Sequence, residues 1–278
     1  MNQQLLTYFS LKFNPFNQEI PTEALWIPTS LENFCWRIEE TLLQEGGFAL
    51  VHGDPGLGKS VALRVLDKRL SSRRDTKVCI ITHTTANLSD FYRELGDIFG
   101  VSLNVNNRWC GFKSLRERWV SHIKQHLLRP IVIIDEAQEI NNVVLNELRL
   151  LSSMNFDSRI LLTVILAGDE RLINKLQETE LLPLGSRIRV RFKTEYATHE
   201  QLITCLQYII NYAGNSSLMT KELMQALCEH SLRNYRVMCN IANDLLTHAF
   251  KNQQPQLDEK LFFDCFHLPS SATNKIRK

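Results

Sequence analysis

A glycine-rich segment in the first quarter of the chain has the residue types and spacing of a phosphate-binding loop. Residues 53–60 read GDPGLGKS and match the pattern GxxxxGK[ST]. Glycines let the backbone curl so that successive N–H groups point at phosphate oxygens, and a helix that begins near Gly58 directs its positive end to the same place. In this pattern Lys59 reaches the β- and γ-phosphates, and the Ser60 hydroxyl ligates Mg²⁺. The segment therefore predicts a site for ATP and Mg²⁺, and the residues expected to contact the nucleotide are Gly53, Asp54, Pro55, Gly56, Leu57, Gly58, Lys59, Ser60 and Val61.

Two adjacent carboxylates follow a short apolar run later in the chain. Asp135 and Glu136 come directly after residues 131–134, which read IVII. At the carboxyl end of a parallel strand they face the crevice that holds the phosphate loop. We expect Asp135 to hold hydrated Mg²⁺ and Glu136 to polarise the attacking water as a general base. The alternative is a pair of solvated acids at a strand end, and no role is assigned to Gln138 and Glu139.

Three further positions could act on the terminal phosphate. Asp169 follows the next apolar run, where it lies either beside the γ-phosphate or in a plain turn, and a carboxylate there repels phosphate unless water or an arginine intervenes. Arg187 precedes a run of alternating basic and apolar residues and is predicted to project into a neighbouring subunit's nucleotide site; Arg189 is a weaker candidate. The alternative is an edge strand with one solvated basic face. Arg236, near the start of a later helix, either contacts the γ-phosphate or lies on the surface.

The periodicity predicts strands that alternate with helices, followed by helices alone. Strands are predicted over 48–51, 78–82, 131–134, 160–166 and 187–192. Helices are predicted over 31–45, 60–70, 87–99, 112–128 and 143–152, and then over 199–213, 220–231 and 235–251. Alternating strands and helices indicate an α/β fold with a parallel sheet and helices on both faces. We therefore expect a P-loop NTPase core followed by a small all-helical lid domain.

The predicted organisation has four parts. An extended, aromatic and proline-punctuated arm over 1–30 packs on a core, and the α/β core spans 31–197. The helical lid spans 198–268, and 269–278 form a flexible tail. The 278 residues are 44% hydrophobic and 22% charged, which is an ordinary globular balance. With a net charge of +2, any DNA affinity must come from a local patch.

The cysteine pattern and the apolar runs indicate the cellular compartment of the protein. Seven cysteines occur without a CxxC pair, which argues for a reducing cytosol and against a disulfide framework or a zinc site. The sequence shows neither a signal peptide nor an apolar run of about 18 residues. We therefore expect a cytoplasmic protein that does not enter the membrane.

Taken together, these motifs resemble those of AAA+ ATPases. More narrowly, residues 11–16, LKFNPF, resemble the opening of the ExeA-like branch. Residues 46–50, 145–152 and 182–190 are similar to a part of that branch often encoded beside transposases, whose relatives are transposition helpers of the MuB, IstB and TnsC kind. The resemblance covers about residues 5–266.

The resemblance implies several properties beyond those read from the residues. Such helpers bind ATP, assemble as rings or helical filaments on duplex DNA, and recruit or stimulate a DDE-type transposase, in some cases with a target-selection protein; hydrolysis then disassembles them. It also implies that Asn14, Pro15 and Phe16 line the adenine pocket. One departure is Arg233, which stands where AAA+ lids usually have glycine, three residues before the lid arginine.

The resemblance also implies where DNA lies. The loops that contact DNA follow the second strand and precede the helix before the acidic pair, and the candidate residues are Thr84, Thr85, Asn107, Arg108 and Lys113. Polar and cationic groups suit contacts with phosphates that read no bases. The alternative is a solvated loop and helix face.

Two other functions remain open from the sequence. One is an ExeA-type secretion ATPase; such proteins carry a membrane span and a wall-binding domain after the ATPase, and neither is expected here. The other is a nucleotide switch that acts on proteins only.

Overall fold

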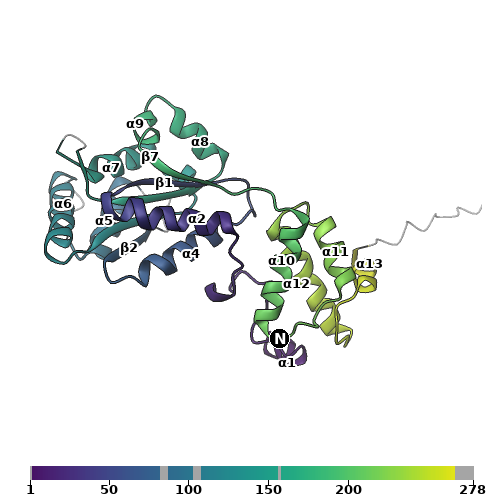
Figure 1. Cartoon of the computed structure of the whole chain (residues 1–278). Coiled ribbons are helices and arrows are strands. Elements are labelled where there is room, and N and C mark those ends of the chain that lie inside the picture. The colour runs from purple at the N-terminus through teal and green to yellow at the C-terminus, as the bar shows by residue number, and fades with distance from the viewer. Residues whose placement is uncertain (1, 82–86, 103–107, 156–157, 267–278) are drawn as a thin grey trace, which may run out of the picture. The chain divides into compact units, whose positions relative to one another are not determined.

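The chain divides into two units, drawn in Figure 1. The computed structural model describes residues 2–81, 87–102, 108–155 and 158–266. An α/β unit runs from Ile27 to Glu195, and a helical unit combines the segment up to Trp26 with the segment from Tyr196 onward.

The α/β unit is built on a parallel sheet of five strands in the order β2-β3-β6-β1-β7. The strands are β1 (Gly47–His52), β2 (Thr76–Ile81), β3 (Arg129–Ile134), β6 (Thr163–Gly168) and β7 (Ile188–Lys193). A separate antiparallel pair joins β4 (Ser153–Met154) and β5 (Arg159–Ile160). The predicted strand over 160–166 is therefore divided, because Ile160 pairs in β5 and the sheet strand begins at Thr163.

Helices cover both faces of this sheet. They are α2 (Thr29–Arg37), α3 (Leu43–Glu45), α4 (Lys59–Ser71), α5 (Leu88–Phe99), α6 (Arg108–Gln125), α7 (Asn142–Ser152), α8 (Glu170–Gln177) and α9 (Leu182–Gly185), with a π-helical turn over Ile38–Leu42 and a 3-10 turn over Ala137–Glu139. Alternate strand residues point to opposite faces. Phe48, Val132 and Val164 belong to an apolar core shared with α5 to α9, while α4 packs against β1, β2 and β6. The predicted α/β class with a parallel sheet is confirmed.

The register of the strands brings three chain segments together at the carboxyl ends of the strands. His52 at the end of β1 pairs with Gly168 at the end of β6, and Ile134 at the end of β3 pairs with Leu166. The segments that leave β1, β3 and β6 therefore begin side by side. They carry the glycine-rich loop, the acidic pair and Asp169.

The helical unit has its own apolar core. Its elements are α1 (Asn2–Tyr8), a 3-10 turn over Thr22–Ala24, α10 (His199–Ala213), α11 (Lys221–His230), α12 (Tyr235–Lys251) and α13 (Glu259–Phe266). Thr198 and Gln201 form a capping box at the start of α10, which supplies partners for backbone N–H groups at the helix end. The helical character predicted after residue 198 is confirmed. The N-terminal segment begins as a helix instead of an extended arm, and Tyr8 of α1 packs edge-on against Phe250 of α12.

Among the described residues, none of the helices combines the length and the apolar character that crossing a bilayer requires.

Candidate active site

The glycine-rich loop connects β1 to the start of α4. Gly58 precedes the helix with φ at +97°, a backbone conformation that residues with a side chain rarely adopt. A Cβ placed there would meet nothing within 4 Å, so the space in front of the helix is open. The N–H groups in the first turn of a helix lack partners within it and form a ready site for an anion. The loop therefore offers the cradle that a phosphate group requires.

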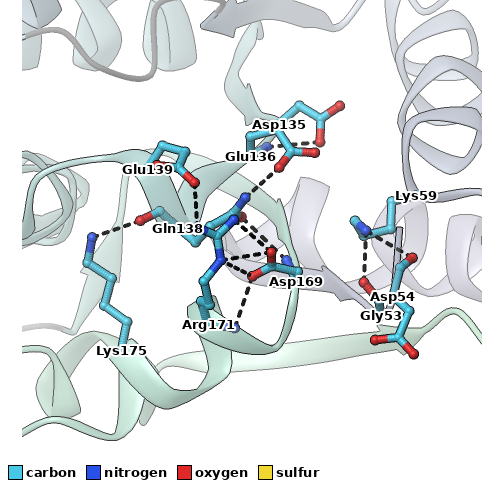
Figure 2. A network of polar contacts seen from close by, with 10 residues as sticks. All are labelled: Gly53, Asp54, Lys59, Asp135, Glu136, Gln138, Glu139, Asp169, Arg171 and Lys175. Carbon is cyan, nitrogen blue, oxygen red and sulfur yellow. Dashed lines mark hydrogen bonds and ion pairs between the residues drawn. The ribbon is translucent and has the colours of Figure 1, made fainter. Parts of the chain in front are cut away.

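Lys59 is the first residue of α4, and its side chain reaches back to the start of the loop. Its side chain is buried, at 7% exposure, and its ammonium nitrogen donates to the carbonyl oxygens of Gly53 at 2.8 Å and Asp54 at 3.2 Å (Figure 2). A buried cation beside a helix N-terminus strongly favours an anionic ligand. The geometry therefore suits phosphate oxygens as additional partners of this ammonium group.

Ser60, in the first turn of α4, contacts Asp135, which follows β3. The Ser60 hydroxyl donates to Asp135 Oδ2 at 3.1 Å. Two oxygen donors at this spacing suit Mg²⁺, which proteins usually hold through one or two side chains together with substrate phosphates and water. The pair thus fits the predicted metal. When bound there, Mg²⁺ would neutralise charge on the phosphates.

Glu136 precedes a short turn, and its side chain is exposed. Its backbone adopts φ +50° and ψ +40° before the turn Ala137–Glu139, and its own N–H donates to Asp135 Oδ1 at 2.9 Å. Lys175 of α8 holds this turn, since its ammonium donates to the carbonyl oxygens of Gln138, at 3.1 Å, and Ile140. An exposed carboxylate on a braced turn beside the metal pair can accept a proton from water.

Asp169 has its carboxylate occupied by its own helix. It caps α8 by accepting the Arg171 backbone N–H at 2.9 Å. It also accepts three hydrogen bonds from the Arg171 guanidinium, at 3.2, 2.9 and 2.8 Å. Hydrogen bonding to Arg171 holds the pKa of Asp169 below its usual range. An arginine thus offsets the charge that would otherwise repel phosphate here. Sequence reasoning missed this partner, although a cap residue and an arginine two positions later are readable signals.

Arg187 lies at the amino ends of the strands, and the phosphate loop lies at their carboxyl ends. It precedes β7, and the next residue, Ile188, pairs with Phe48 near the start of β1. The loop begins only after β1 ends, and the six residues of β1 span about 20 Å at roughly 3.3 Å each. Within its own chain Arg187 donates to the Pro183 carbonyl. Any action on a nucleotide must therefore be directed at a second molecule, and this role stays a prediction.

The residues predicted to surround the adenine lie in the helical unit. The Asn14 side chain donates to Asn243 Oδ1 at 2.8 Å and accepts the Phe16 backbone N–H at 3.0 Å. Pro15 and Phe16 are buried, the latter within the apolar core of that unit. These contacts fix the segment, and its contact with adenine stays a prediction.

The lid arginine and the unusual residue before it also belong to the helical unit. Arg236 is exposed in the first turn of α12, where its N–H donates to the Asn234 side chain at 2.9 Å. Arg233 adopts φ +61°, the region that favours glycine. Its guanidinium donates to the Ala197 carbonyl at 2.9 Å. Arginine at position 233 therefore still adopts the turn that favours glycine. The role of Arg236 stays a prediction.

The structure describes only some of the residues predicted to contact DNA. Thr84, Thr85 and Asn107 lie outside the described residues. Arg108 donates through two guanidinium nitrogens to Glu147, a carboxylate that is 1% exposed. Lys113 is 64% exposed and lies 3.8 Å from Glu117.

Comparisons with known proteins agree with this geometry. Residues 41–176 match the family model described as "AAA domain". General secretion pathway protein A of Aeromonas hydrophila is 26% identical over 247 residues, which are 87% of this chain and 44% of that protein. The chain thus spans less than half the length of this curated relative.

Solved structures share the fold. The ORC2 protein of Aeropyrum pernix, in its ADPNP–ADP complexes, gives a TM-score of 0.71 at 15% identity, covering 90% of this chain and 70% of that one. Drosophila ORC bound to DNA gives 0.70 at 14% identity, covering 95% and 65%. The chain has the AAA P-loop NTPase fold with a helical C-terminal part, and it is an ATPase.

Replacing Lys59 by alanine is expected to weaken ATP binding by about 10- to 100-fold, the cost of losing hydrogen bonds to a charged group. Titration of the purified variant with ATP, followed by calorimetry, measures this change. Lys68→Ala is the matched control, because Lys68 is exposed on the same helix. Equal ATP affinity of the Lys59 variant and the parent would exclude the phosphate contact.

Proposed function

We propose that this ATPase is an ATP-dependent, DNA-binding regulator of DNA transposition. Its ATP-bound subunits assemble as a homo-oligomer on duplex DNA. The assembly recruits or stimulates a DDE-type transposase, together with a target-selection protein where one exists. Hydrolysis of ATP then releases the subunits.

In this proposal the active site works through five side chains. Lys59 binds the β- and γ-phosphates, Ser60 and Asp135 hold Mg²⁺, and Glu136 removes a proton from the attacking water. Arg187 reaches from the neighbouring subunit and stabilises the negative charge that develops on the transferred phosphoryl group. Support for this division comes from the 3.1 Å contact between Ser60 and Asp135 and from the place of Arg187 before β7, at the amino ends of the strands.

One exposed surface carries the DNA-binding part of the proposal. The α6 face consists of Trp109, Phe112, Lys113 and Arg116. Trp109 is 72% exposed and stacks on Phe112, with ring centroids 6.2 Å apart and planes 9° apart. The Arg116 guanidinium lies 5.0 Å from the centre of the same Phe112 ring. Cationic and aromatic groups on one helix face suit contacts with a phosphate backbone.

The base of the α6 face is firmly anchored. Arg108, the first residue of α6, binds the buried carboxylate of Glu147, which also accepts the Tyr92 hydroxyl. The hydrogen bond to Glu147 raises the pKa of Arg108 further above the physiological range, so its guanidinium keeps its charge. A helix fixed at this end presents its neighbouring side chains in a defined orientation. Drosophila ORC, which shares this fold, is bound to DNA in its solved structure, and this supports the use of the fold on DNA.

Co-sedimentation with duplex DNA tests the proposed function. The protein is expected to sediment with DNA in the presence of ATP and to remain in solution with ADP or without nucleotide, because ATP joins the subunits. Equal sedimentation under the three conditions would contradict the proposal. A transposase expressed with the protein should then join the ATP-bound complex.

Changing Lys113 to alanine is expected to weaken duplex binding and to reduce the slope of log affinity against log salt by about 0.9, the value for one lost phosphate contact. Fluorescence anisotropy at several salt concentrations measures both. Lys124→Ala removes an equal charge from an exposed position further along α6 and serves as the control. If the two variants bind alike, the α6 face does not contact DNA.

A second candidate function is an ATPase of the secretion type. The similarity to General secretion pathway protein A over 87% of this chain favours it. It differs from the first proposal in needing no DNA. ATPase activity and assembly that are indifferent to added duplex would support this second candidate.

A further inference from the structure

Gln138 links two segments of the active site through its side-chain amide. It is 8% exposed, inside the turn that follows Glu136. Its amide nitrogen donates to Glu136 Oε2, and its amide oxygen accepts the Asp169 backbone N–H at 3.3 Å (Figure 2). The amide thus joins the carboxylate after β3 to the first residue after β6.

Chemistry determines which end of this amide faces Glu136. A backbone N–H can only donate, so the amide oxygen must face Asp169 and the NH₂ group must face Glu136. Gly168 provides the room for this arrangement. A Cβ there would lie 2.5 Å from Gln138 Oε1, which is too close for two unbonded atoms.

The amide is not needed to hold the turn itself. Lys175 already binds the carbonyl oxygens of Gln138 and Ile140, so the backbone of this turn is fixed by another side chain. What the amide adds is a directed donor to an exposed carboxylate on a long, flexible side chain. Since a carboxylate has two oxygens, a donor on Oε2 leaves Oε1 to accept a proton from water.

We propose that Gln138 is a positioning residue for ATP hydrolysis. It holds the Glu136 carboxylate in one orientation and ties that orientation to the Asp169 backbone at the end of β6. A shift of this strand end therefore changes how Glu136 meets the attacking water. The inference rests on the proposed role of Glu136 as the general base.

Two substitutions at Gln138 separate positioning from space filling. Gln138→Met keeps the length and volume of the side chain and removes both amide bonds. Gln138→Glu keeps an acceptor for the Asp169 N–H, but once ionised it cannot donate to Glu136 and repels it. Both variants are expected to lower the turnover number by about 10- to 100-fold at pH 8, with unchanged affinity for ATP.

The separation of kinetic constants adds a signature that packing alone does not produce. Both variants should lower the turnover number while the KM for ATP stays at the parent value, because the residues around Lys59 that bind the phosphates are untouched. Glu139→Gln is the control and should keep the parent rate, because Glu139 lies in the same turn but its carboxylate pairs with Arg171 of α8, 2.9 Å away.

Failure of the inference about Gln138 can be distinguished from failure of the proposed function. Glu136→Gln is measured beside the other variants, and parent-like hydrolysis in that variant would overturn the role of Glu136 itself. If Glu136→Gln is inactive while Gln138→Glu turns over like the parent at pH 8, Gln138 does not position the base. Loss of ATP affinity or of thermal stability in both Gln138 variants would also overturn the inference in favour of a packing role.

Discussion

Replacing Arg187 by alanine is expected to lower ATP turnover by about 10³-fold or more, the effect of removing an arginine supplied in trans in phosphoryl transfer. The reason is positional, since Arg187 precedes β7 at the amino ends of the strands, away from its own phosphate loop. ATP affinity measured on dilute protein should stay unchanged. Steady-state hydrolysis over a range of protein concentrations measures the effect, and the specific rate of the parent should rise with concentration.

Mixing two inactive variants gives the control for this prediction. Subunits with Arg187→Ala keep an intact loop and carboxylates, while subunits with Glu136→Gln keep the arginine. A mixture should recover part of the activity that each lacks alone. Arg191→Ala, a change on the strand β7 that follows Arg187, should retain the parent rate. Turnover that is independent of concentration, with no recovery in the mixture, would refute a shared site.

Changing Glu136 to glutamine is expected to reduce hydrolysis by about 10²- to 10⁴-fold, the range for loss of a general base. ATP binding should persist, because the loop around Lys59 and the contact between Ser60 and Asp135 are untouched. The proposed assemblies on DNA should then accumulate, since the step that releases them is blocked. Single-turnover hydrolysis and co-sedimentation with DNA measure the two effects.

Glu139→Gln provides the comparison, because it removes an equal charge three residues further along the same turn while leaving Glu136 intact. A parent-like rate for Glu136→Gln would show that another group activates the water. Loss of ATP binding in that variant would show that Glu136 serves the loop instead.

The strands could be predicted because buried parallel strands read as short continuous apolar runs. The predicted strand over 160–166 shows where this signal misleads. Ile160 continues the apolar run but pairs in β5, outside the main sheet. Thr163 interrupts the run yet lies inside β6, because its hydroxyl donates to the Leu42 carbonyl at 2.9 Å.

The local motifs of the candidate site could be predicted from the sequence, but the contacts between distant chain segments could not. The loop and the acidic pair are contiguous patterns, and the structure brings Ser60 within 3.1 Å of Asp135. Gln138 gained no role from the sequence, because its partners come from segments that only the fold unites. Asp169 and Lys175 lie 31 and 37 residues away from it. Short helices such as α9, with four residues, are also too short to show the periodic spacing of apolar residues that predicts a helix.

The N-terminal segment illustrates a further limit. Its aromatic residues predict packing on a core, but they do not say which core. Phe9 and Phe16 are buried among residues of α10 to α13, and the Lys12 backbone N–H donates to the Ala213 carbonyl at 2.9 Å. The first and last parts of the chain therefore fold together, which no local pattern reveals.

The two carbonyl bonds of Lys59 have a consequence for nucleotide affinity. Gly53 and Asp54 already accept from this ammonium group, so the buried positive charge has hydrogen-bond partners within its own loop. An arriving triphosphate must compete with acceptors that are already in place, so its affinity reflects an exchange of partners.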